Sequence, residues 1–487
     1  MKQLLLFLTL STYIGYAQVQ IGADIDGEAA NDYSASVSLS SDGSIAAIGA
    51  SFNDGNGPES GHVRVYQNIS GVWTQVGDDM DGEAANDRSS IVSLSADGTI
   101  VAIGAILNNA NGAEAGHVRV YQNISDIWTQ VGDDIDGEAA GDWFGNSISL
   151  SSDGSIVAIG APKNDGNGPN SGHVRIYQNI SGVWTQIGAD IDGESGGNFS
   201  GGSVSLSADG TIVAIGASFN DDSGSNAGHV RVYQNTSDVW TQVGSDIDGE
   251  AASDESGYSV SLSSDGSIVA IGANKNDDNG TESGHVRVYK NVSGVWTQIG
   301  GDIDGETAQD GSGYSISLSA NGTIVAIGAP QNDGNGANSG HVRMYQNISD
   351  VWTQIGTDID GEVAGDWSGL SVSLSSDGGT VASGALFSAG NGSNSGHVRV
   401  FDISGLVLSS GEFQANQEII TLYPNPSSNI ITISANVNSI TVIDITGKKV
   451  IESNQSTFNI EDLTNGMYLL EIITDNGVKV IKRLIKE

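Results

Sequence analysis

Seven histidines and a recurring set of carboxylates are the residues of this chain best suited to chemistry. Every histidine stands in the tetrapeptide Gly-His-Val-Arg, at His62, His117, His173, His229, His285, His341 and His397. An imidazole serves as a general acid or base, or as a metal ligand. Seven equal sites make a poor catalyst, because acid–base chemistry needs groups whose surroundings push their pKa values apart. We therefore predict a structural role, a polar contact between repeats with a neighbouring carboxylate as partner.

The carboxylates recur as Asp-x-Asp-Gly-Glu, followed in most copies by a further Asp four residues on. Alternate side chains of an extended segment point to one side, so these groups can converge on Ca²⁺, which takes roughly six to eight oxygen ligands. The alternative is that Asp and Gly shape a turn while the acids solvate a surface. The candidate calcium ligands are Asp246, Asp248, Glu250 and Asp254 in one copy and Asp302, Asp304, Glu306 and Asp310 in the next.

Short β-strands must position these groups. In the repeat that spans the fourth histidine to the fifth, β-branched or alternating segments occur at 240–244, 259–263, 267–272 and 285–289. Such segments are typical of strands, and a Ser-Asp-Gly hairpin signal separates the second from the third. No segment has a helical period of useful length. Each repeat therefore predicts four antiparallel strands.

Seven such repeats predict an all-β fold, a seven-bladed β-propeller over residues 18–408, with a flat β-array as the alternative. Ring closure has two candidate segments. The body holds six Trp-Thr-Gln strands, and residues 18–22 resemble the end of a seventh, without a blade before it. These residues are able to complete the last blade across the seam, and residues 403–408 compete for the same place.

The two ends of the chain differ from the repeats. Residues 1–17 have a lysine, an apolar run and a small-residue exit, which predicts a cleaved signal peptide and a mature chain that starts at Gln18. Residues 409–417 read as a linker and residues 418–487 as a separate domain. The chain has no cysteine, so its stability must come from core packing without disulfides. No later stretch predicts a transmembrane segment.

The charge balance restricts the partners. The formal net charge of -41 is concentrated in the repeats. Such a surface repels nucleic acid and anionic lipid, and it favours cations or a basic partner. Nucleic-acid binding is therefore not expected.

The repeats resemble a known family. Residues 256–289 combine Ser-Gly-Tyr-Ser-Val-Ser-Leu, Val-Ala-Ile-Gly-Ala and Gly-His-Val-Arg-Val-Tyr, a pattern similar to the FG-GAP repeat of integrin α-subunit propellers. In that family, calcium is bound by an Asp-rich loop in the first hairpin of certain blades. Here the hairpin shrinks to Asp-Gly or Asn-Gly in every copy. The resemblance supports the propeller, and we expect that calcium site to be absent.

The tail resembles a second family. Tyr-Pro-Asn-Pro at 423–426, an Asn-Gly-x-Tyr turn at 465–468 and a basic end are similar to the type A C-terminal sorting domain of the bacterial type IX secretion system. Such domains are small antiparallel β-sandwiches that direct cargo across the outer membrane. The resemblance implies the type IX machinery as a partner, and a secreted or cell-surface location.

Near-identical repeats differ at two positions, one after the interblade acids and one in the loop between the second and third strands. Both loops emerge on one face of a propeller, where varied aromatic side chains are typical of a recognition surface. The alternative is drift at exposed positions. The candidate ligand-surface residues are Tyr33, Arg88, Trp143, Phe199, Glu255 and Trp367 at the first position and Phe52, Phe219 and Phe387 at the second.

Two functions are compatible with these features. The first is a secreted or surface-bound binding or adhesion module for an extracellular glycan or protein. The second is a propeller hydrolase or lyase that acts on an extracellular polysaccharide. An enzyme would need unique acids, bases or a nucleophile near the axis, and the differences between repeats are aromatic or singly charged. We predict a binding protein without catalytic residues, with calcium as the only cofactor considered.

Overall fold

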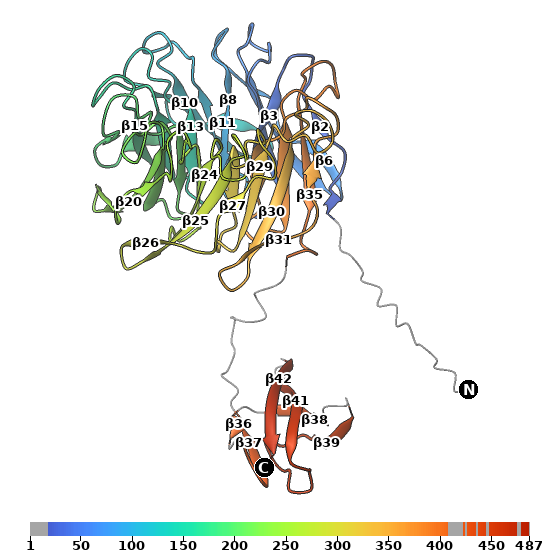
Figure 1. The fold of residues 1–487 in the computed structure, drawn as a ribbon. Coiled ribbons are helices and arrows are strands. Elements are labelled where there is room, and N and C mark those ends of the chain that lie inside the picture. Colours follow the sequence, from blue (N-terminus) through green and yellow to red (C-terminus); the bar gives the residue numbers. More distant parts are fainter. Residues whose placement is uncertain are drawn as a thin grey trace. The chain divides into compact units, whose positions relative to one another are not determined.

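The computed structural model describes residues 18–407, 422–423, 426–434, 437–444, 448–474 and 479–486. The chain divides after Val407 into two compact units. The first is a ring of seven five-stranded antiparallel sheets (Figure 1), which confirms the predicted all-β propeller. None of the described residues forms a helix able to cross a membrane. The predicted signal peptide, residues 1–17, and the linker, residues 409–417, lie outside the described residues.

The innermost strand of each blade ends in Ser-Leu, preceded in six of the seven blades by a further serine two residues before this one. Its leucine N–H donates to a serine hydroxyl of the preceding blade, as in Leu94 to Ser38 Oγ at 3.1 Å and Leu39 to Ser373 Oγ at 3.0 Å. The side chain of a polar strand position thereby ties two sheets together around the axis. These strands are β3 (Ser34–Leu39), β8 (Ser89–Leu94), β13 (Ser147–Leu150), β18 (Ser203–Leu206), β23 (Ser259–Leu262), β28 (Ser315–Leu318) and β33 (Ser368–Leu374).

The second strand is buried on both faces, because neighbouring blades cover it from either side. Its glycine is required where two blades touch: a Cβ at Gly160 would collide with the carbonyl oxygen of Gly201 in the next blade. These strands are β4 (Ile45–Ala50), β9 (Ile100–Ala105), β14 (Ile156–Ala161), β19 (Ile212–Ala217), β24 (Ile268–Ala273), β29 (Ile324–Ala329) and β34 (Thr380–Ala385).

The third strand begins at the repeated histidine. Its alternation places Val63 and Val65 in an apolar cluster with Val101 and Ile103 of the next blade, while Tyr66 packs toward the preceding one. Blade-to-blade packing thus buries both faces of every sheet. These strands are β5 (His62–Ile69), β10 (His117–Asn123), β15 (His173–Ile180), β20 (His229–Thr236), β25 (His285–Val292), β30 (His341–Asn347) and β35 (His397–Asp402).

The outer strand contains the Trp-Thr-Gln sequence. Each indole N–H donates to a backbone carbonyl of the preceding blade, for example Trp240 to Ile187 O at 2.9 Å. The exception is the last blade, whose outer strand comes from the N-terminus. These strands are β6 (Val72–Gln75), β11 (Trp128–Gln130), β16 (Val183–Gln186), β21 (Val239–Gln242), β26 (Val295–Gln298), β31 (Trp352–Gln354) and β1 (Val19–Gln20).

A fifth strand of two residues was not expected from the sequence. The Ile-Asp pair inside Asp-x-Asp-Gly-Glu, which is Met-Asp in the first blade, forms backbone hydrogen bonds with the start of the third strand, so that Asp248 faces His229 in register. The interblade segment is therefore partly a strand, because its apolar residue finds a buried place beside the histidine strand. These strands are β7 (Met80–Asp81), β12 (Ile135–Asp136), β17 (Ile191–Asp192), β22 (Ile247–Asp248), β27 (Ile303–Asp304), β32 (Ile359–Asp360) and β2 (Ile25–Asp26).

The C-terminal unit is a pair of antiparallel sheets on one apolar core. One sheet has the order β36-β37-β40 and the other β39-β38-β41-β42. Buried residues of both sheets, including Ile431, Val442 and Leu470, form the shared core, as expected of a small sandwich. The strands are β36 (Leu422–Tyr423), β37 (Ile430–Ile433), β38 (Val437–Asp444), β39 (Lys449–Ser453), β40 (Thr457–Asn459), β41 (Gly466–Thr474) and β42 (Lys479–Lys486).

The N-terminal residues close the ring. In β1, Val19 pairs with Asp402 and Gln20 with Phe401 of β35, so the blue start of the chain lies beside the orange last blade in Figure 1. The N–H of Ile21 then donates to Val400 O at 2.7 Å. Residues 403–407 form a turn instead of the outer strand. The first of the two predicted closures is confirmed.

Deleting residues 18–22 from the mature chain should lower the melting temperature sharply. The deletion removes the β1 pairing and leaves Trp73 Nε1 without its acceptor, Ile21 O at 2.7 Å. At about 1 kcal/mol per hydrogen bond, the free energy of unfolding should fall by about 3 kcal/mol or more. Calorimetry compares the deletion with a variant of unchanged length in which Gln18 alone becomes Ala. An unchanged melt of the deletion variant would contradict this closure.

The turn between the first two strands depends on one carboxylate oxygen. Asp265 Oδ1 accepts hydrogen bonds from Ser263 Oγ at 2.8 Å and from Ser267 N at 2.9 Å. Burial opposes ionisation of this carboxyl, but these hydrogen bonds outweigh it and hold the pKa of Asp265 below 3.8. In the sixth blade, Asn321 accepts the same bonds with an amide oxygen. The pKa is lowered in the same way at Asp42, Asp97, Asp153 and Asp209.

Acid should therefore weaken the turns. A depressed carboxyl pKa stabilises the fold above the unfolded pKa, and that stability is lost as pH falls through the lower folded value. Replacing all five lowered Asp residues by Asn should leave the melting temperature at neutral pH nearly unchanged, as Asn321 indicates. The variant should also lose less melting temperature than the parent between about pH 4 and pH 2. Equal acid losses in both proteins would exclude this role.

Candidate functional site

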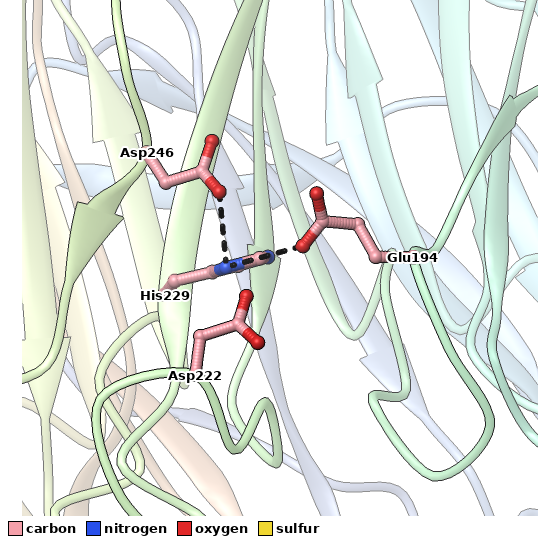
Figure 2. A group of neighbouring side chains, drawn as sticks. All are labelled: Glu194, Asp222, His229 and Asp246. Atoms are coloured by element: carbon pink, nitrogen blue, oxygen red, sulfur yellow. Dashed lines mark ion pairs between the residues drawn. The ribbon is translucent and has the colours of Figure 1, made fainter.

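The histidines lie at the junctions between blades, together with carboxylates from separate segments. At the start of β20, His229 Nδ1 is 3.9 Å from Glu194 Oε2, which precedes it in the chain, and 3.8 Å from Asp246 Oδ2, which follows it. Figure 2 shows these two carboxylates and Asp222 around the imidazole. The ring is buried, at 1% exposure, whereas Glu194 is about two-fifths exposed.

The same arrangement recurs around the ring. His62 Nδ1 lies 3.8 Å from Glu28 Oε2 and 3.5 Å from Asp79 Oδ2, and His397 lies 3.8 Å from Asp24 across the seam. The histidines thus lie beside carboxylates of neighbouring repeats, as predicted. The acids of one Asp-x-Asp-Gly-Glu segment separate, however: Asp246 joins the His229 group, and Glu250 joins the His285 group with Asp302. Likewise, Glu306 pairs with Arg343.

The remaining predicted calcium ligands have other contacts. Asp254 and Asp310 are buried and cap the turn before them: Asp254 Oδ2 accepts from Ala251 N at 3.1 Å, and Asp310 Oδ2 accepts from Thr307 N at 2.9 Å. Asp248 and Asp304 pair in β22 and β27 with the histidine strand. The four acids of one copy are thus distributed over different contacts. Calcium binding stays a prediction.

The FG-GAP calcium loop has no counterpart in the first hairpin. That hairpin offers at most one carboxylate per blade, and Asp265 already accepts bonds from Ser263 and from Ser267. A calcium cage needs roughly six to eight oxygens. The residues present in this hairpin do not fit the family's ion.

The arginine two residues after each histidine takes one of two positions. In five blades it donates to a backbone carbonyl of the preceding junction, as Arg231 does to Asp192 O at 2.7 Å. In the third and sixth blades it binds the junction carboxylates instead: Arg175 donates to both oxygens of Asp190, and Arg343 to both oxygens of Asp358. The junction acids of those two blades are therefore neutralised.

Burial sets the charge of the histidines. Desolvation, reinforced by the Arg231 charge, lowers the pKa of His229 to about 4, despite the acids nearby. The pKa of His62 and of His117 also falls to about 4. Desolvation raises the pKa of Glu194 and Glu250. At neutral pH the junctions therefore present neutral imidazoles beside carboxylates.

The variable aromatic positions meet on one face. The two predicted loops contact each other within blades, with ring centroids 4.8 Å apart for Tyr33 and Phe52, 5.2 Å for Phe199 and Phe219, and 5.2 Å for Trp367 and Phe387. Contacts also cross the blades, since Tyr33 lies 5.7 Å from Phe387 and Arg88 lies 4.3 Å above Phe52. We call Trp367, Phe387, Tyr33, Phe52 and Arg88 the aromatic patch.

The other predicted surface residues lie outside this patch. Lys163 Nζ lies 3.1 Å above the Trp143 ring. Glu255 is buried, at 5% exposure, and pairs with Lys275 at 2.7 Å, so it is poorly placed to meet a ligand.

The first variable position has a left-handed backbone in every blade. The φ angle is 56° at Tyr33, 57° at Trp143, 53° at Phe199 and 57° at Trp367, and the sixth blade has glycine there. Bulky side chains rarely adopt this conformation, which costs roughly 1–3 kcal/mol at functional sites.

Some distinctive residues escaped the sequence analysis. Tyr258 and Tyr314, from neighbouring blades, have ring centroids 4.9 Å apart, and burial raises the pKa of Tyr258. Asp222 and Asp278 stand where the other blades have glycine or alanine. A position-by-position comparison of the repeats would have found all four residues.

The axis of the ring holds a cavity of about 160 Å³. Its lining repeats with the blades as a leucine and a small residue, from Leu39 and Ser41 to Leu374 and Ser376. The lining residues of the seven blades are nearly the same and include no cluster of unlike groups. The cavity is therefore a weaker candidate for a functional site than the aromatic patch.

Two family models match the chain, one within the propeller and one in the tail. Residues 135–177 and 245–289 match the family model described as FG-GAP repeat, and residues 421–487 match the secretion system C-terminal sorting domain. No curated protein matches the chain. Among solved structures, hydrazine synthase of Kuenenia stuttgartiensis is 14% identical, with a TM-score of 0.49 over 76% of this chain and 96% of that chain.

The propeller thus contains FG-GAP repeats, at residues 135–177 and 245–289, and a type IX sorting domain follows at residues 421–487. The protein is secreted by the type IX system or displayed on the cell surface, and its sorting domain is the part that the secretion machinery recognises.

Removing residues 418–487 should stop export at the outer membrane and leave the propeller in the periplasm. The sorting match begins at residue 421, and the propeller unit ends before it, so the truncation leaves the blades intact. Immunoblots of periplasmic, surface and medium fractions measure the distribution. A control protein that carries Asp265→Asn retains the tail and should still leave the periplasm. Surface display of the truncated protein would refute the role of the tail.

Proposed function

We propose that this secreted propeller is a binding or adhesion module that holds an extracellular glycan or protein through the aromatic patch. The observation that carries the proposal is the continuity of the patch. Its rings contact one another from the seventh blade across the seam to the first, and Arg88 extends it to the second. The near-identical repeats around it form a rigid scaffold, and the patch residues lie at loop positions that vary from blade to blade.

The side chains of the patch suit recognition. Trp and Tyr bring large contact areas with few rotatable bonds, so ordering them on binding costs little entropy. Contacts with Phe387 and Phe52 further limit the motion of Tyr33. Rigid aromatic residues of this kind dominate the binding energy of protein interfaces.

Arg88 adds a directed polar group. Its guanidinium pairs with Glu59 at 2.7 Å and lies over the Phe52 ring, so its orientation is set before a ligand arrives. The side chain is about one-third exposed, which leaves donors for a hydroxyl or carboxylate of the ligand.

Backbone strain at Tyr33 and Trp367 supports the same proposal. A glycine would relieve the left-handed strain, as it does at Gly311, yet these positions carry two of the largest side chains. Strain of this kind is typical of functional sites.

A polysaccharide hydrolase or lyase has less support, because its acids and bases would have to come from junctions that repeat nearly the same groups.

The test begins with glycan and protein arrays probed with the mature chain. For a ligand so identified, Tyr33→Gly should weaken binding at least about tenfold, which corresponds to about 1.4 kcal/mol. The melting temperature should change by only a few degrees, because relief of strain at φ 56° offsets the lost ring contacts. Titration calorimetry measures affinity, and a thermal melt measures stability.

Phe199→Gly is the matched control. It has the same left-handed backbone and a ring partner, Phe219, but it belongs to a different blade. We expect it to leave the affinity unchanged. If neither Tyr33→Gly nor Trp367→Gly alters binding, the aromatic patch is not the ligand surface. Release of soluble sugars from a polysaccharide would instead favour the enzyme.

A further inference from the structure

The fourth and fifth blades differ from the others in the loop that approaches the junction histidine. They carry Asp222 and Asp278, whereas the equivalent residues of the other blades are Gly55, Ala110, Gly166, Gly334 and Gly390. The change adds a carboxylate at a place where the fold otherwise has no functional side chain. These two junctions each combine one histidine with three acids.

The four side chains of each junction converge on one point. In the fourth blade they are Glu194, Asp222, His229 and Asp246, drawn in Figure 2, and one ligand atom from each lies within 4.8 Å of all the others. In the fifth blade the same geometry unites Glu250, Asp278, His285 and Asp302. The donors come from three segments: the interblade segment before the histidine, the loop ahead of it, and the interblade segment after it.

The histidine is the second observation that indicates a ligand. His229 and His285 are each only 1% exposed, and the Nδ1 atom of each has no hydrogen-bond partner among the described residues. That atom nevertheless faces acids: His229 Nδ1 is 3.8 Å from Asp246 Oδ2, and His285 Nδ1 is 4.0 Å from Asp278 Oδ2. A buried polar atom without a partner is costly, and a cation between it and the carboxylates would satisfy all of them.

We propose that these two junctions each bind a first-row divalent transition-metal ion, with Zn²⁺ as the representative, through one imidazole nitrogen and carboxylate oxygens. An imidazole and carboxylates are ligands that Zn²⁺ takes in four-coordinate sites, whereas Ca²⁺ sites are built from oxygen alone. The donor set therefore distinguishes this site from a calcium site.

Small side-chain movements would complete the coordination. Tetrahedral ligands at about 2.0 Å from Zn²⁺ lie about 3.3 Å apart, against the 3.8–3.9 Å measured from His229 Nδ1 to its acids. Glu194 and Asp246 are partly exposed and Asp222 is exposed, so rotation of these side chains can bring their oxygens together, while buried His229 stays in place.

The charge of the fourth junction fits a dication. Three carboxylates surround a histidine, and one guanidinium group, Arg231, lies 3.7 Å from Glu194. The third and sixth junctions lack the extra acid, and there Arg175 and Arg343 already bind the junction acids. The fourth and fifth junctions are therefore suited to the ion, whereas in the third and sixth junctions an arginine already binds the acids.

The experiment is isothermal titration of the metal-stripped mature protein with Zn²⁺. The parent should bind two ions per chain, and Ca²⁺ at the same ionic strength should bind at least tenfold more weakly. Asp222→Ala and Asp278→Ala should each remove one site, and the double variant both. Alanine occurs naturally at this place, at Ala110, so the variants are expected to fold, and a thermal melt checks this.

Two further measurements control the result. Asp265→Asn removes one negative charge in a turn, away from the junctions, and should leave the stoichiometry at two. Co²⁺ bound to the parent should show visible absorption bands that Asp222→Ala and Asp278→Ala each reduce by half. Zn²⁺ binding that persists in the double variant, or Ca²⁺ binding as tight as Zn²⁺ binding, would overturn the proposal.

Discussion

A closed circle of hydrogen bonds around the axis is the constraint on which the rest of this propeller depends. The second residue after each inner strand donates its N–H to a backbone carbonyl of the next blade, from Ser41 to Ala96 and onward until Ser376 donates to Ser41. The distances are 2.8–2.9 Å throughout. Closure leaves only the short outer strands as sheet edges, which limits the template for aggregation in a protein without cysteine.

Closure also determines where function can reside. Seven blades of almost the same sequence place their histidines, arginines and inner serines in equivalent surroundings. Equivalent surroundings are compatible with a structural role, whereas acid–base catalysis needs groups whose surroundings differ. Differences therefore appear on the loops of one face, at residues such as Tyr33, Trp367 and Asp222. The loop that carries Asp222 also carries Phe219, so both kinds of difference use one connection.

The junction histidine has a structural role in most blades, and in two blades it is also part of the proposed metal site. Its buried imidazole sits between acids of consecutive repeats, and the arginine beside it decides whether those acids are already neutralised. Arg175 takes the carboxylate of Asp190, whereas Arg231 reaches a backbone carbonyl. A single change in the adjacent loop, from glycine to aspartate, then alters the donor set without altering the fold.

The sequence by itself determined the repeat and four strands of each blade, because alternation and turn residues are local features of the chain. It left two candidates for the closing segment, and the structure selected residues 18–22. It also indicated the family of the repeats, the family of the tail and the variable aromatic positions. Only the tertiary structure decided which acids meet. Asp246 and Glu250 are neighbours in one segment, but the extra strand Ile247–Asp248 lies between them and sends them to successive junctions. Contacts between blades join residues some 35 positions apart, such as Glu194 and His229. Local spacing in the sequence cannot predict such contacts, because they depend on how the blades pack.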